Sequence, residues 1–201
     1  MRQAEYFIQA NQYLNGMVAR IGDRWQETVP AAPAWTVHDL VNHVTINNLA
    51  LAAWLEGKEA VEADDVLGLD AQGAWTDSAE RAEKLAADCI DGEREVVTPL
   101  GTLTIADTLL LQTTDRLVHG WDLSGALDTD VAMPPALAQA AYDFIIVHAD
   151  ALRAAEAFGP EAAVRPGAGV VDKLLAVTGR DSGYRPAQPD DEPKAQEIHR
   201  S

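Results

Sequence analysis

Two histidines and one aspartate have the residue types and the spacing that can hold a metal ion. Asp115 and His119 are four residues apart in a segment with helical periodicity, so both side chains project from one face of one helix. His43 belongs to an earlier helical segment, in a narrow strip beside the apolar face, where a bundle helix directs polar groups toward a neighbour. A carboxylate and two imidazoles suit zinc or a similar transition metal. Three protein ligands leave one position for water or substrate, which is typical of catalytic sites.

The same residues also fit plain structural roles, which spacing alone favours. Asp115 can pair with a neighbouring arginine, and His119 and His43 can be hydrogen-bonded core histidines. Two further residues extend the group. Asp122, one turn beyond His119, is a candidate to hold the imidazole N–H or to form a salt bridge elsewhere. Asn47, one turn beyond His43, is a candidate substrate contact or an interhelical hydrogen bond.

Other kinds of chemistry have less support in the sequence. The lone cysteine, Cys89, lies on the apolar face of a predicted helix and is expected to be a small core residue. No Gly-x-Ser-x-Gly nucleophile motif and no Gly-rich phosphate loop is present. The net charge of −17 would repel nucleic acids and anionic membrane surfaces, so we expect neither as a partner. A single cysteine and the lack of a long uncharged apolar run favour a cytoplasmic protein.

Helices must position these residues, because a helical period dominates the chain. Thr36 and Thr104 each have an aspartate three residues later, a capping pattern that opens two of the helices. Residues 95–104 change to a strand-like pattern around a Pro-Leu-Gly turn and predict one small hairpin. The expected helices cover residues 4–25, 36–55, 77–89, 104–126, 134–158 and 170–177. Residues 1–181 would form one domain, and the Pro-rich, charged residues 182–201 a disordered tail.

Several ordered segments of the chain resemble a known family. Residues 35–43 (Trp-Thr-Val-His-Asp-Leu-Val-Asn-His) are similar to the opening of the second helix in the DinB-like superfamily. Residues 115–123 (Asp-Arg-Leu-Val-His-Gly-Trp-Asp-Leu) resemble the acid-x-x-x-His-x-Trp-Asp-Leu segment of its actinobacterial branch, the mycothiol-dependent maleylpyruvate isomerase-like proteins. The stretches 157–160 and 173–181 are similar to the closing segments of one subfamily. The resemblance therefore extends from the first helix to about residue 181.

This resemblance implies both a fold and a metal site. The implied fold is all-α, a DinB-like four-helix bundle with a small β-hairpin and a short C-terminal helix. The implied site is a divalent metal, with zinc favoured, bound by His43, Asp115 and His119. The better characterised members often carry glutamate at the position of Asp115. Because aspartate is one methylene shorter, we expect the metal to lie closer to its helix, to bind through water or to differ in identity.

The resemblance also implies an activity. Members of known activity use a low-molecular-weight thiol, mycothiol in actinobacteria, to isomerise maleylpyruvate or to transfer the thiol to electrophiles. We therefore expect a metal- and thiol-dependent isomerase or S-transferase, whose partners are the thiol cosubstrate and a small electrophile. The attacking sulfur would come from the cosubstrate, which is consistent with a structural Cys89. Two alternatives stay open: a non-catalytic bundle that binds a metal or ligand for regulation or interaction, and assembly as a homodimer.

Overall fold

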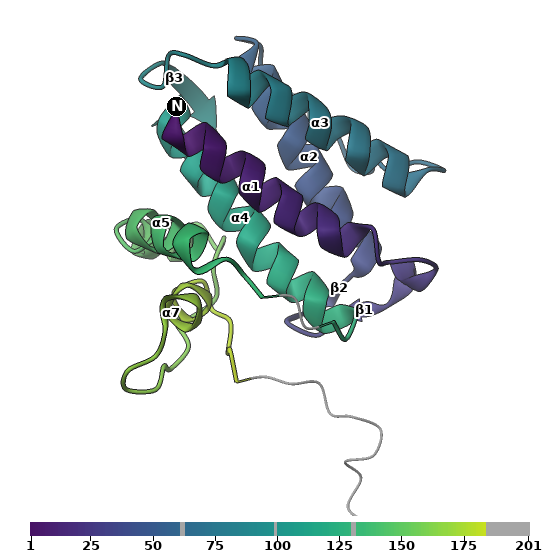
Figure 1. Ribbon diagram of the computed structural model, residues 1–201, viewed down its shortest axis with the longest axis vertical. Helices are drawn as coiled ribbons and strands as arrows, with labels where there is room; N and C mark the ends of the chain where they lie inside the picture. Colours follow the sequence, from purple (N-terminus) through teal and green to yellow (C-terminus); the bar gives the residue numbers. More distant parts are fainter. Residues whose placement is uncertain (61–62, 99, 130–131, 184–201) are drawn as a thin grey trace, which may run out of the picture.

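The computed structural model describes residues 1–60, 63–98, 100–129 and 132–183, which are mostly helical (Figure 1). Four long helices form a bundle in which α1 and α2 each pack against both α3 and α4. The long helices are α1 Arg2–Val18, α2 Val37–Leu55, α3 Ala71–Asp88 and α4 Ile105–Ala126. Three shorter helices follow, which are α5 Pro135–Ile145, α6 Ala149–Ala154 and α7 Val170–Val177. The all-α bundle expected from the sequence is confirmed.

In the described part of the chain, two small antiparallel hairpins join the helices, one more than the sequence predicted. The predicted one pairs β3 (Glu95–Thr98) with β4 (Gly101–Thr104) in regular register just before α4. The second pairs β1 (Thr28–Val29) with β2 (Ala32–Thr36) just before α2, and its register is irregular. The proline-containing sequence of this stretch reads as a loop, because proline weakens the strand pattern from which a hairpin is predicted.

The two helices that carry the predicted ligands begin at the residues that their capping patterns predict. The Thr36 hydroxyl accepts a hydrogen bond from the backbone N–H of Asp39 at 3.2 Å, and the Asp39 carboxylate accepts one from the backbone N–H of Thr36 at 2.8 Å. At the start of α4, the Thr104 hydroxyl accepts from the backbone N–H of Asp107 at 3.0 Å. These caps satisfy N–H groups that the first helical turn leaves without partners. They therefore fix where each ligand-bearing helix begins.

Helix α1 is shorter than expected. The helix predicted over residues 4–25 ends at Val18, and Gly22 then adopts a φ of +60°, a left-handed conformation that glycine adopts at little cost. A 3₁₀ turn, η1 (Arg24–Gln26), follows. Trp25 in that turn packs against the same hydrophobic core as α1. The apolar spacing that reached Trp25 therefore reflects packing on one core and not one continuous helix.

Two other helix predictions were wrong in detail. Helix α3 begins at Ala71, because Asp70 caps it by accepting a hydrogen bond from the Gly73 N–H at 2.9 Å, and the predicted cap Asp77 lies inside the helix. The helix predicted over residues 134–158 is interrupted after α5, where the N–H of His148 bonds three residues back before α6 starts. No glycine or proline marks that interruption in the sequence.

The core lies between the long helices, and α4 is buried along most of its length, polar residues included. Helix α5 packs on α4, and α7 packs on α5, so the C-terminal helices cover one side of the bundle (Figure 1). Within the described residues, we find no helix that is both long and apolar enough to cross a membrane. Almost all of the expected tail falls on residues 184–201, outside the described residues.

Candidate metal centre

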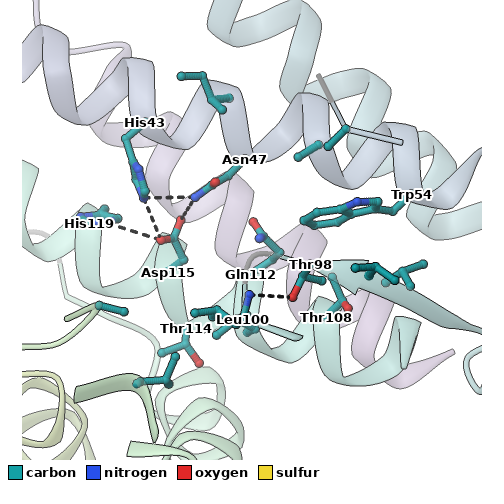
Figure 2. Close-up of a pocket in the computed structure, with 18 of the residues that line it drawn as sticks. His43, Asn47, Trp54, Thr98, Leu100, Thr108, Gln112, Thr114, Asp115 and His119 are labelled. Carbon is teal, nitrogen blue, oxygen red and sulfur yellow. Dashed lines mark hydrogen bonds and ion pairs between the residues drawn. The ribbon is translucent and has the colours of Figure 1, made fainter. Parts of the chain in front are cut away.

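The three predicted ligands converge between α2 and α4 (Figure 2). His43 comes from α2, whereas Asp115 and His119 lie one turn apart on α4. Asp115 Oδ1 lies 3.3 Å from His43 Nε2 and 3.4 Å from His119 Nε2. One ligand atom of each residue lies within 4.8 Å of those of the other two, which is a geometry that can hold a metal ion.

Asn47, one turn beyond His43, joins the same group (Figure 2). Its Nδ2 lies 3.1 Å from His43 Nε2 and 3.3 Å from Asp115 Oδ2. An amide nitrogen only donates, so His43 Nε2 must accept from Asn47, although the same atom also faces an oxygen of the Asp115 carboxylate. One ring nitrogen cannot both accept and donate. With a cation in the site, the single lone pair of His43 Nε2 would bind the cation and the Asn47 amide would keep its bond to Asp115 Oδ2, so the donor set fits a metal.

Arg116 binds the Asp115 carboxylate through the oxygen that does not face the two histidines. Its guanidinium is fully buried and donates to Asp115 Oδ2 at 2.9 Å and to Asn48 Oδ1 at 2.6 Å, and also to the Gln112 side chain. With Oδ2 engaged there, Oδ1 is the oxygen that faces the two histidines. Burial lowers the pKa of Arg116 to about 10, so the group stays charged at neutral pH.

The charges around Asp115 and His119 decide their protonation. Burial alone would raise the pKa of Asp115, but His119 and His43 hold it well below its usual range. Burial alone would lower the pKa of His119, but Asp115 and Asp122 raise it to about 9. Without a metal, His119 is therefore an imidazolium at neutral pH, placed between two carboxylates.

Asp122 lies against the far side of the His119 ring. Its Oδ2 is 3.1 Å from His119 Nδ1, and its side chain is fully buried. Arg180, just after α7, holds the same carboxylate with contacts of 2.9 and 3.3 Å. Since Asp122 occupies Nδ1, the other ring nitrogen, Nε2, is the one directed toward Asp115.

Trp35 covers the two histidines. Its ring stacks on His119 with centroids 5.8 Å apart and an interplanar angle of 26°, and it contacts His43 at 5.1 Å. In the sequence, Trp35 stood out only as the first residue of the stretch 35–43 that resembles the opening of the second DinB-like helix. Arg180 was missed as a member of the site. The pairing of Asp115 with a neighbouring arginine, which the sequence offered as a structural alternative, is present as its ion pair with Arg116 at 2.9 Å. A distant arginine gives no signal in a single sequence, because most arginines are exposed on the surface.

The ligand group lies in the wall of a large cavity of about 1240 Å³. Trp54 lies at the other end of the labelled group in Figure 2, and Val96 of β3 and Leu111 of α4 add apolar surface. Phe158 and Arg180 of the C-terminal segment complete the lining. A metal site at the edge of a mostly apolar cavity is suited to act on a bound small molecule.

Cys89, His148 and His38 take structural positions. Cys89 is the C-cap residue of α3 and packs, half-buried, against a small hydrophobic cluster that includes Phe7. His148 precedes α6 and contacts Phe144 with ring centroids 4.6 Å apart. His38 is half-buried and lies 3.8 Å from a carboxylate oxygen of Asp65.

Comparison with known proteins identifies the family to which this chain belongs. Residues 8–124 match the family described as the mycothiol maleylpyruvate isomerase N-terminal domain. Because the match spans more than half of the chain, the protein belongs to this family. A crystal structure of a histidine-to-alanine mutant of the mycothiol-dependent maleylpyruvate isomerase is similar, with a TM-score of 0.54 and 15% identity over 69% of this chain. The similarity covers 66% of that chain, just under two thirds of it, and shows the shared fold alone. No curated protein matches.

Proposed function

We propose that the protein is a divalent-metal-dependent enzyme that uses mycothiol or a similar low-molecular-weight thiol. Its reaction would be S-transfer to an electrophile or cis-trans isomerisation of a maleylpyruvate-like substrate. The convergence of His43, Asp115 and His119 in the wall of a large cavity carries this proposal. Family membership supports it, since the matching region covers all three ligands.

The metal would be held by His43 Nε2, Asp115 Oδ1 and His119 Nε2, with zinc the favoured ion for two imidazoles and one carboxylate. A bound divalent metal would lower the pKa of a coordinating thiol, so that the thiolate is available near neutral pH. Arg116 binds Oδ2 of Asp115, which leaves Oδ1 directed toward the histidines. The mostly apolar lining of the cavity would reduce the contact of an attacking sulfur with water.

The thiol chemistry itself is simple. The thiol loses its proton, and its sulfur electron pair forms an S–C bond to an electron-poor carbon. In an isomerisation, the C=C electrons move onto the substrate, the remaining single bond rotates, and the S–C bond then breaks to restore the double bond and release the thiolate. In an S-transfer, the S–C bond is kept, and a leaving group departs with its electron pair or the product takes up a proton. No cysteine of the chain is needed in either case.

The test begins with protein purified without a His-tag and analysed for metal. Zinc-loaded protein is then titrated with mycothiol by calorimetry, and thiol transfer is measured with a bimane or chlorodinitrobenzene as the electrophile. We expect His119→Ala to abolish metal binding and transfer, because it removes one of three ligands. The matched control His148→Ala removes a histidine outside the ligand group and should retain both. Cys89→Ser should also retain both.

Two outcomes would contradict the proposal. If Cys89→Ser eliminates turnover while His119→Ala spares it, the chemistry belongs to the cysteine. If wild-type protein binds metal but neither mycothiol nor an electrophile, the non-catalytic metal-binding alternative replaces the enzyme.

A further inference from the structure

Arg180 connects the C-terminal helices to the metal centre. It follows α7, which packs on α5, and α5 in turn packs on α4. The family match ends at residue 124, so Arg180 lies outside the matching region. Nevertheless, its side chain reaches a carboxylate on α4 that touches a predicted ligand.

The contacts of Arg180 form a fixed arrangement. Its Nη2 lies 2.9 Å from Asp122 Oδ2 and its Nε lies 3.3 Å from Asp122 Oδ1, so the guanidinium holds both carboxylate oxygens. Its Nη1 donates to the backbone oxygen of Thr178 at 2.7 Å, which anchors the arginine to the end of α7. Asp122 Oδ2 also lies 3.1 Å from His119 Nδ1.

We infer that Arg180 is a positioning residue for the metal centre, which holds the His119 ring through Asp122 so that Nε2 points toward Asp115. This inference rests on the proposed function, because it assigns Arg180 a role in metal binding. The C-terminal segment would then be part of the metal site and not only a cover over one side of the bundle.

Charge and geometry support this role. The Asp122 side chain is fully buried, and an unpaired buried carboxylate is unfavourable. His119 contacts only one carboxylate oxygen, so His119 alone leaves the carboxylate free to turn about its own axis. The bidentate contact of Arg180 with both oxygens removes that freedom. A planar guanidinium can make such a contact, whereas an ammonium group cannot. A fixed carboxylate on the far nitrogen orients a metal-binding imidazole and makes it a better ligand.

A purely structural role for Arg180 would predict a different result, and Arg153 provides the comparison. Arg153 also ties the C-terminal segment together, through Asp150 at 2.8 Å, Glu161 at 3.1 Å and the backbone oxygen of Val177 at 3.2 Å. These contacts do not involve the ligand group. If Arg180 only docks α7, removing either arginine should have the same effect on the metal.

The experiment measures zinc affinity of the full chain by competition with a chromophoric chelator at about pH 9.5, where proton competition for the ligands is small. We expect Asp122→Asn to weaken binding by about 10- to 100-fold and Arg180→Met by about 3- to 10-fold, since partners of ligands affect affinity on this scale. Arg180→Lys should restore part of the loss. Arg153→Met should bind within about twofold of wild type, since it touches no partner of a ligand. The double variant Asp122→Asn/Arg180→Met should bind no more weakly than Asp122→Asn, because Arg180 acts through Asp122.

A second measurement needs no metal. In ¹⁵N-labelled metal-free protein, the proton on His119 Nδ1 should exchange with water faster in Arg180→Met than in wild type or Arg153→Met. Unchanged exchange and unchanged zinc affinity in Arg180→Met would overturn the inference while the proposed function stands. Losses that add in the double variant would also overturn it. A wild-type protein that binds no metal would instead refute the proposed function, and this inference with it.

Discussion

Proton competition at His119 predicts a steep pH dependence of metal binding. The carboxylates of Asp115 and Asp122 outweigh the effect of burial and raise the pKa of His119 to about 9. A metal needs the free electron pair of Nε2, so the ring must lose a proton when the metal binds. At pH 7, this pKa lies about two units higher, which costs about 3 kcal/mol, or about 100-fold in apparent affinity.

The direction of this pH dependence follows from the protonation of His119 and of Asp115. Apparent affinity should rise about tenfold per pH unit from pH 7 toward pH 9 and then level off, because His119 is neutral above its pKa. Asp115 adds no dependence in this range, because its pKa lies well below the usual value and it stays ionised. Zinc affinity is measured at several pH values with a chelator whose own protonation is corrected for. Calorimetry in buffers of different ionisation enthalpy should show about one proton released near pH 7.

A matched variant sharpens this test. Asp122→Asn removes one of the two carboxylates that raise the pKa of His119, so its affinity should level off at a lower pH than in wild type. An affinity that stays flat between about pH 7 and 9, with no proton release, would show that His119 is already neutral without metal. That result would refute the charge arrangement described for the site.

Three further predictions concern stability and the ligand set. In metal-free protein, the folded pKa of His119 near 9 exceeds its unfolded value near 6.5, so this group stabilises the fold fully below about pH 6.5. About 3 kcal/mol of the free energy of unfolding should be lost as pH rises through 9, as urea denaturation across this range will test. Asp115→Glu should keep metal, with zinc affinity within about tenfold and an altered rate of thiol transfer, because the longer side chain moves the carboxylate toward His43; complete loss of zinc would contradict this. Gly120→Ala should destabilise the fold by about 1–3 kcal/mol in urea denaturation, because its new Cβ would lie 2.3 Å from Cε1 of Tyr13. Gly125→Ala on the same helix has no neighbour within 4 Å and should be neutral or stabilising; equal effects of the two substitutions would exclude the clash.

Local chemistry explains which parts of the fold the sequence could predict. The caps at Thr36 and Thr104 depend on residues three positions apart, so they are visible in the sequence and set α2 and α4 correctly. The start of α3 was misplaced because Asp70 and Asp77 are both plausible caps. Only packing decides between two such signals. The interruption before His148 involves neither glycine nor proline, so it follows from tertiary structure and leaves no local sign.

In the site, too, local features could be predicted from the sequence and long-range contacts could not. The spacing of Asp115 and His119 on one helix is a local property, and it placed them on one face correctly. Their convergence with His43 depends on the packing of α2 against α4. Residue spacing gives no information about this packing, whereas the family resemblance predicted the convergence correctly. The contact of Arg116 with Asn48 and that of Arg180 with Asp122 could not be predicted, because the partners lie 68 and 58 positions away in the sequence.

The buried pair of Asp115 and Arg116 has a consequence for how such sequences should be interpreted. Removing the carboxylate would leave a fully buried guanidinium without its charged partner, which costs about 3–5 kcal/mol in comparable cases. Natural selection for a stable fold would therefore retain Asp115 in a descendant that had lost all metal chemistry. Fold stability does not require His43 in this way, since its side chain is 38% exposed at the cavity. Across a lineage, replacement of His43 would thus be the earlier and more sensitive sign that the ancestral reaction has been abandoned.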